Sequence, residues 1–267
     1  MPDEKIAPAK TALAVRAYLM VRLAMHTGLR QRNLRELLLC MPGRKPRSSH
    51  DLEGLEQREI RWSREERHWE IFIPACAFKN SGSPFFHGRP YHIVLPQLDN
   101  LYRYIEDYIE RHRPLLMGGR HYPDTFFVRT FRSAFRCQPH DVSSFYDAWM
   151  DIIQRYGIHN PYTGKGAIIG LLPHGPHSVR DVIATHILKQ TGSYELAGFA
   201  LQDTTAAVMR HYSRFAPHEK TAMAADILND VWQKKPRRQS VSSNLNASGP
   251  GEWPRPQRGK RRNSTSP

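Results

Sequence analysis

Apolar residues recur every three or four positions over several stretches of this chain, a spacing typical of helices with one buried face. We expect helices over 10–26, from about 29 to 39, and over 97–113, 143–156, 177–190, 194–201, 204–211 and 218–232. Gly28 follows the first helix, where a glycine with positive φ ends a helix. Pro114 is expected to break the helix before it.

Between these helices the pattern changes to short runs rich in β-branched and aromatic residues. The runs cover 58–62, 69–73 and 91–95 and are separated by short turns, which predicts an antiparallel meander of three strands. The turn between the second and third strands carries Lys79. The predicted fold class is therefore α+β and mostly helical, with a small three-stranded antiparallel sheet against a helical core.

The chain has 267 residues and an apolar fraction that supports a packed core, as one large domain or two small ones. We expect a lead-in over 1–9, a folded region over 10–232, and a tail over 233–267. The tail sets Lys and Arg among Ser, Asn, Pro and Gly, a composition typical of disorder. Either it contacts DNA as a basic arm or it is a solvated remnant.

Charge and cysteine content narrow the function classes. Lys and Arg number 39 against 25 Asp and Glu, a formal net charge of +14. This charge favours a polyanionic partner. Nucleic acid is favoured over a membrane surface because the chain has no basic amphipathic helix or lipidation motif.

Cys40, Cys76 and Cys137 form no disulfide framework or metal pair. With no signal peptide or membrane-length apolar run, we expect a cytoplasmic, nucleoid-associated protein.

Candidate chemistry is concentrated in 173–212. A His-x-x-Arg pair, His177 and Arg180, begins one predicted helix, and Tyr212 ends a later segment. Arginine binds phosphate through charge-assisted hydrogen bonds, histidine transfers protons near neutral pH, and tyrosine can be a covalent nucleophile. Arg30 lies at another helix start, directly after a tight turn. Any one of these residues alone would more often be structural, but together they indicate chemistry on a phosphodiester.

In order and spacing, these positions resemble the tyrosine recombinases, or phage-integrase family. Thr27-Gly28-Leu29-Arg30 is similar to the family's first arginine box, and Lys79 to its lysine on a β-hairpin. His177-Ser178-Val179-Arg180 resembles the His-x-x-Arg box, and Tyr212 the nucleophile. The order, spacing and predicted local structure of the four motifs agree with the family across 10–232, nearly all of the chain that is expected to fold.

The resemblance implies a catalytic domain that integrates or recombines double-stranded DNA, as such enzymes do for phages and other mobile elements. Arg30 and Arg180 would bind the scissile phosphate, Tyr212 would form a 3′-phosphotyrosine link, and Lys79 would protonate the departing 5′-hydroxyl. His177 would transfer a proton or bind the phosphate. The family works as a tetramer through a Holliday junction, and no metal or other cofactor is implied.

Two positions depart from the family pattern. Asp203 stands nine residues before Tyr212, where His or Trp is common, and Asn33 stands where Glu is frequent. An ionised aspartate cannot donate a hydrogen bond to phosphate, although it could orient a phosphate ligand or a backbone N–H. We count Asp203 among the candidate catalytic residues.

Three interpretations follow from the sequence. The first is an active site-specific recombinase, and the second is an impaired or truncated DNA-binding protein of the same fold. The third is a relaxing enzyme like type IB topoisomerases. Because family members carry an N-terminal DNA-binding domain and only 1–9 precede the first helix here, we expect a fragment, a minimal version or a separate partner that supplies that domain. The sequence specifies neither the DNA site nor the direction of the reaction.

Overall fold

The computed structural model describes residues 7–82, 86, 88–118, 124–130 and 139–212, together with 221, 222, 224–226, 228 and 229. The side chain of Tyr212 lies outside the described part. So do most of the helix expected over 218–232 and all of the tail expected over 233–267. The chain divides into two units, 1–223 and 224–267, and every contact described below belongs to the first.

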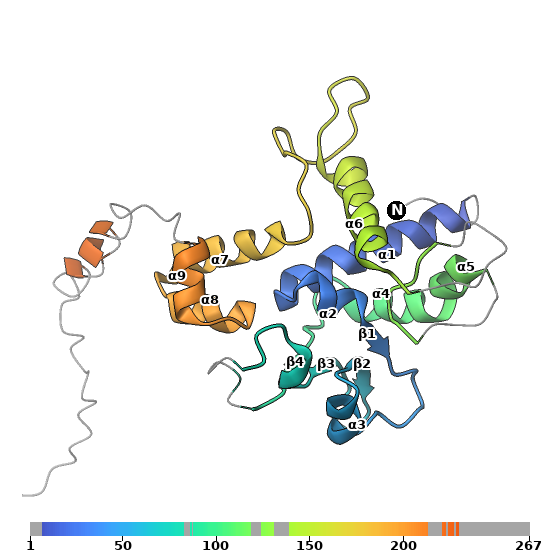
Figure 1. Cartoon of the computed structure of the whole chain (residues 1–267). Coiled ribbons are helices and arrows are strands. Elements are labelled where there is room, and N and C mark those ends of the chain that lie inside the picture. Colours follow the sequence, from blue (N-terminus) through green and yellow to red (C-terminus); the bar gives the residue numbers. More distant parts are fainter. Residues whose placement is uncertain are drawn as a thin grey trace, which may run out of the picture. The chain divides into compact units, whose positions relative to one another are not determined.

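The first unit is mostly helical with one small sheet, as the sequence predicts (Figure 1). The α-helices are α1 (Pro8–Thr27), α2 (Gln31–Arg35), α3 (Ser49–Gly54), α4 (Leu101–Asp107), α5 (Arg113–Met117), α6 (Val142–Ile152), α7 (Ser178–Thr191), α8 (Tyr194–Leu201) and α9 (Thr205–Tyr212). Two π-helical turns, η2 (Tyr108–His112) and η3 (Ile153–Gly157), follow α4 and α6, and a 3₁₀ turn, η1 (Ala75–Ala77), precedes Lys79.

The sheet has four strands in the order β1-β2-β3-β4: β1 (Leu37–Leu39), β2 (Arg58–Ser63), β3 (His68–Ile73) and β4 (Tyr91–Val94). β2, β3 and β4 form the expected antiparallel meander, but β1 pairs with β2 in parallel. The prediction of three antiparallel strands was therefore wrong, and so was the helix expected to run to residue 39.

The strand β1 depends on partners far away in the chain. Leu37 pairs with Arg58, and the N–H of Leu39 donates to the carbonyl of Asp124 at 2.7 Å. A run of three leucines has no period of its own, so neighbouring backbone decides between helix and strand.

Pro114 does not break its helix, contrary to the prediction. The π-helical turn η2 leads directly into α5, and Pro114 occupies the first turn of α5, which ends at Gly118. A proline is tolerated there because its missing N–H would have no partner within the new helix.

The main core lies between α1, the sheet, α4, η2 and α6. Its largest fully buried side chains include Trp69, Trp149, Tyr108 and Phe126. A smaller apolar cluster joins α7, α8 and α9: Ala184, Leu188, Ala197, Leu201 and Val208. This second cluster brings the predicted His-x-x-Arg helix and the Tyr212 helix together.

Gly28 connects this three-helix group to the end of α1. Its φ is +61°, and a Cβ atom at this position would lie 2.4 Å from the carbonyl oxygen of Ala200. Only glycine combines this backbone conformation with so close an approach. The turn before Arg30 therefore packs directly against the end of α8.

Candidate active site

Arg30 is the N-cap residue of α2 and lies two residues after Gly28. Its backbone is extended, and its carbonyl accepts hydrogen bonds from the N–H groups of Asn33 and Leu34. The side chain is 23% exposed. The end of α2 is fixed to the sheet by an ion pair of Glu36 with Arg58, so the backbone that carries Arg30 is held at both ends of the short helix.

Arg180 lies in the first turn of α7 and is almost entirely buried, with 1% of its side chain exposed. One of its terminal nitrogens, Nη1, donates to the carbonyl of Gly28. Its Nε–H is buried and has no hydrogen-bond partner among the described residues. Arg180 is thus a buried cation next to the turn that positions Arg30.

Asp203 connects the two arginines. Its Oδ2 lies 2.7 Å from Nη2 of Arg30 and 3.2 Å from Nη2 of Arg180. We call Arg30 and Arg180 together the arginine clamp. Two guanidinium groups from distant segments converge on one anionic oxygen, a geometry that also suits a phosphate.

The backbone around Asp203 is fixed as well. Its N–H donates to the carbonyl of Gly198 at 2.9 Å, and its Oδ1 accepts from the N–H of Thr204 at 3.2 Å. A Cβ on Gly198 would lie 2.9 Å from the Asp203 carbonyl oxygen, so the end of α8 packs closely on this link. The carboxylate is held in place by the α8–α9 connection.

Two residues that the sequence did not single out complete the cluster. Asn80 accepts a hydrogen bond from Nη1 of Arg30 at 2.8 Å and donates to the carbonyl of Gln202 at 3.0 Å. Gln202 is buried in a left-handed conformation, and its amide donates to the carbonyl of Thr27 at 2.7 Å. Their only sequence signal is adjacency, because Asn80 follows Lys79 and Gln202 precedes Asp203.

Lys79 lies in the connection between β3 and β4, directly after η1. Its side chain is exposed. The next residue, Asn80, contacts Arg30, so the backbone of the lysine is tied to the clamp. The structure thus places the backbone of Lys79 next to the cluster and leaves its side chain exposed.

His177 immediately precedes α7 and is exposed. Partial removal from water lowers the pKa of its imidazole, and the positive charges of Arg180, Arg30 and His211 lower it further, while Asp181 raises it. His177 is therefore within electrostatic range of the clamp and of the end of α9. A lowered pKa keeps the imidazole neutral at pH 7, able to accept a proton.

Tyr212 is the last residue of α9 and follows His211. Its backbone is placed by the packing of α9 on α7 and α8 through Val208. The position of its hydroxyl lies outside what the structure describes. Of the six predicted site residues, the structure brings three into direct contact, Arg30, Arg180 and Asp203, and places His177 and the backbone of Lys79 nearby.

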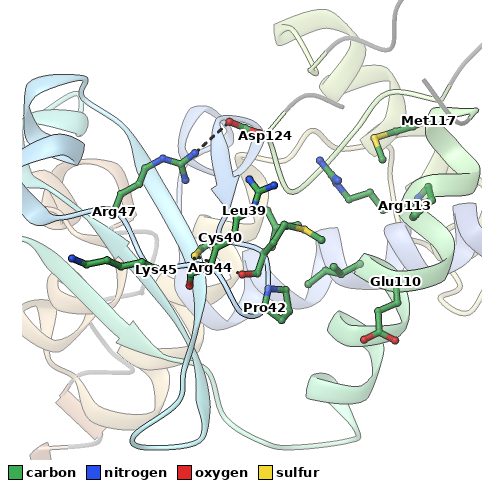
Figure 2. A pocket seen from close by; sticks show the side chains of 13 residues that line it. Leu39, Cys40, Pro42, Arg44, Lys45, Arg47, Glu110, Arg113, Met117 and Asp124 are labelled. Carbon is green, nitrogen blue, oxygen red and sulfur yellow. Dashed lines mark hydrogen bonds and ion pairs between the residues drawn. The ribbon is translucent and has the colours of Figure 1, made fainter. Parts of the chain in front are cut away.

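A separate basic pocket of about 710 Å³ lies on another part of the unit (Figure 2). Its lining includes Arg44, Lys45 and Arg47 from the loop after β1, and Arg113 from α5. Arg47 pairs with Asp124 across the pocket, whereas Arg44 and Lys45 are exposed and have no carboxylate partner among the described residues. None of the predicted catalytic residues lines it.

Within the described ranges, no three His, Cys, Asp or Glu side chains gather closely enough to hold a metal ion. Likewise, none of the helices that the structure describes has the length and apolar character needed to cross a membrane.

No protein-family model matches this chain, and no curated protein matches it. Two similar solved structures are both of XerH site-specific recombinase bound to difH substrate. The post-cleavage complex with a palindromic substrate is 16% identical and aligns over 82% of this chain and 47% of that one, with a TM-score of 0.48. The pre-cleavage complex is 14% identical over 84% and 48%, with a TM-score of 0.46. The chain spans about half the length of these proteins.

Proposed function

We propose that this chain is a site-specific DNA recombinase of the tyrosine type, which cuts and rejoins DNA through a 3′-phosphotyrosine intermediate. The observation that carries the proposal is the arginine clamp. Arg30 and Arg180, distant in sequence, both direct a terminal nitrogen at one anionic oxygen. A protein with a net charge of +14 and a preformed two-arginine anion site is suited to bind a DNA phosphate.

In the proposed reaction, the clamp binds the non-bridging oxygens of the scissile phosphate. Charge on these oxygens grows as the phosphorus becomes five-coordinate, and two guanidinium groups stabilise it. Arg180 is buried, so its field is poorly screened by water and is correspondingly strong. The clamp then acts mainly on the transition state.

The covalent step forms one bond and breaks another. The phenol oxygen of Tyr212 attacks phosphorus and loses its proton, while the bond from phosphorus to the 5′-oxygen breaks and that oxygen takes a proton from Lys79. The product is a 3′-phosphotyrosine ester and a free 5′-hydroxyl. The reverse attack rejoins the strand without ATP.

His177 is the candidate acceptor for the phenol proton. Its pKa is lowered, so it is neutral and can accept a proton at pH 7. Its position at the start of α7, with His211 in electrostatic range, supports a role next to Tyr212. The proposal also includes double-stranded DNA as substrate and a homotetramer on the DNA.

The test is capture of the covalent intermediate. The full chain is incubated with nicked duplexes of randomised sequence, from which the short strand bearing the new 5′-hydroxyl dissociates after cleavage. We expect a protein–DNA adduct in a denaturing gel, and mass spectrometry should locate the phosphotyrosine at Tyr212. Tyr212→Phe should abolish the adduct and retain binding, while Tyr162→Phe, on a fully exposed loop tyrosine, should keep the yield. An undiminished adduct with Tyr212→Phe would show that another residue is the nucleophile.

A second candidate is a DNA-binding protein of the same fold without turnover. One contact favours it, because the carboxylate of Asp203 holds the nitrogens that a phosphate would need. Such a protein would bind duplex DNA with a steep loss of affinity on raising salt. It would give no adduct from the wild-type chain with any member of the nicked library.

A further inference from the structure

Asp203 places a negative charge between the two guanidinium groups of the clamp. Its Oδ2 is the shared acceptor, at 2.7 Å from Arg30 and 3.2 Å from Arg180. The side chain of Asp203 is only 15% exposed. A carboxylate oxygen in this position makes the charge-assisted hydrogen bonds that a phosphate oxygen would make.

The carboxylate also stabilises the clamp when no DNA is bound. Two guanidinium groups this close repel each other, and Arg180 is buried, so both need a counter-ion in a poorly hydrated place. Removing the negative charge while keeping both arginines should therefore make the folded protein less stable. This is the ordinary structural role of a buried ion pair.

The same contact conflicts with phosphate binding. The other terminal nitrogen of Arg30 donates to Asn80, and that of Arg180 donates to the carbonyl of Gly28. The Nη2 groups directed at Asp203 are thus the ones that face the shared anion position. A phosphate that takes this position meets a carboxylate of like charge and must displace it.

We propose that Asp203 is a positioning residue that acts through Arg30 and Arg180 as the resident anion of the clamp, and that a DNA phosphate binds by displacing it. This inference rests on the proposed function, because it assigns the clamp to phosphate. Asp203 holds the two guanidinium groups in place before DNA binds, and it weakens phosphate binding by competing for them. Phosphate entry is an exchange of one anion for another.

Asp203→Asn separates the two effects of the carboxylate. The amide keeps the shape of the side chain and an oxygen for the N–H of Thr204, and it removes the negative charge. Inorganic phosphate is the probe, titrated calorimetrically into the full chain. We expect Asp203→Asn to bind phosphate about tenfold or more tightly than wild type, since a competing charge is gone. Without phosphate the variant should have a lower melting temperature.

If Asp203 had only a structural role, its replacement would lower both the stability and the phosphate affinity. A lower melting temperature together with tighter phosphate binding therefore indicates exchange. Asp203→Ser is the second variant, because a hydroxyl can still accept from Thr204 without carrying charge. Asp99→Asn is the matched control, since it removes the charge from a surface Arg–Asp pair with Arg22, and it should leave phosphate affinity unchanged. Arg180→Gln added to Asp203→Asn should abolish the gain.

The inference is overturned if both neutral variants bind phosphate no more tightly than wild type. It is also overturned if the gain survives Arg180→Gln, since the anion would then bind elsewhere. Failure of the proposed function gives a different result: the phosphate affinity rises in Asp203→Asn, but no DNA adduct forms in either protein.

Discussion

Arg30 donates a hydrogen bond from Nη1 to the side-chain oxygen of Asn80 at 2.8 Å. The amide of Asn80 donates in turn to the carbonyl of Gln202 at 3.0 Å. One side chain therefore joins the β3–β4 connection, the start of α2 and the link between α8 and α9. Because Lys79 precedes Asn80, the same amide fixes the backbone of the proposed proton donor relative to the clamp.

Asn80→Ala should loosen this junction. A hydrogen bond to a charged group contributes about 1.5–3 kcal/mol, and Asn80 is half-buried, so we expect the free energy of unfolding to fall by about 1–2 kcal/mol. The rate of adduct formation should fall as well, because Arg30 and Lys79 lose their common support. Urea unfolding and adduct kinetics measure the two effects. Ser81→Ala, on the exposed neighbour, is the control, and equal stability of the two variants would contradict the role of Asn80.

Gly28→Ala should be strongly destabilising. The residue has φ +61°, and the added Cβ would lie 2.4 Å from the carbonyl oxygen of Ala200. Left-handed backbone strain and overpacking together suggest a loss of about 2–4 kcal/mol in the free energy of unfolding. The comparison is Gly54→Ala, where the added Cβ meets no atom within 4 Å. If urea unfolding gave both variants the same stability, the close packing of this turn on α8 would be wrong.

The sequence predicted most helices because each has an apolar face that can be read locally. The helices α1, α4 and α6 were predicted from apolar residues at helical spacing, and the antiparallel meander from its β-branched and aromatic runs. β1 was missed because the strand conformation of Leu37–Leu39 is decided by pairing with Arg58–Ile60, which no local pattern encodes. Pro114 was misread because the π-helical turn before it gives the proline a new helix start.

The residues of the candidate site were also only partly predictable from the sequence. Arg30, His177 and Arg180 stood out because their residue types and spacing carry chemistry. Asn80 and Gln202 did not, because their roles depend on partners from distant segments. Arg30 donates to the side chain of Asn80, and the carbonyl of Thr27 accepts from Gln202. The contact of Asp203 with both arginines was likewise invisible in the sequence, since long-range ion pairs follow only from the folded chain.

The basic pocket of Figure 2 supplies a prediction about DNA affinity. Arg44 and Lys45 are exposed cations on its rim. If each contacts one phosphate, the double variant Arg44→Ala, Lys45→Ala should reduce the slope of log affinity against log salt by about 2. Fluorescence anisotropy with a labelled duplex at several salt concentrations measures this slope. The control is the double variant Lys10→Ala, Arg103→Ala, which removes two charges from α1 and α4. An equal decrease of the slope in that control would mean that Arg44 and Lys45 act only through the net charge of the protein.

His140 makes the stability of the protein depend on pH. Burial lowers the pKa of this imidazole to about 4, with the charge of Arg16 adding to the effect. Above the unfolded value of 6.5 the imidazole is neutral in both states. As the pH falls from 6.5 toward 4, the unfolded chain binds a proton that the folded protein does not, so this histidine progressively favours unfolding. The accumulated loss is on the order of 3 kcal/mol.

His140→Gln should remove this contribution, because the amide does not titrate. Carboxylates also titrate toward pH 4, so the informative quantity is the difference in unfolding free energy between variant and wild type, measured by urea unfolding at pH 7.5, 6, 5 and 4. We expect this difference to shift in favour of the variant as the pH falls, even if Gln packs less well and costs stability at pH 7.5. His50→Gln, at an exposed position of α3, controls for the loss of one imidazole. A difference for His140→Gln that stays constant with pH would mean that His140 takes up its proton as readily in the folded protein as in the unfolded chain.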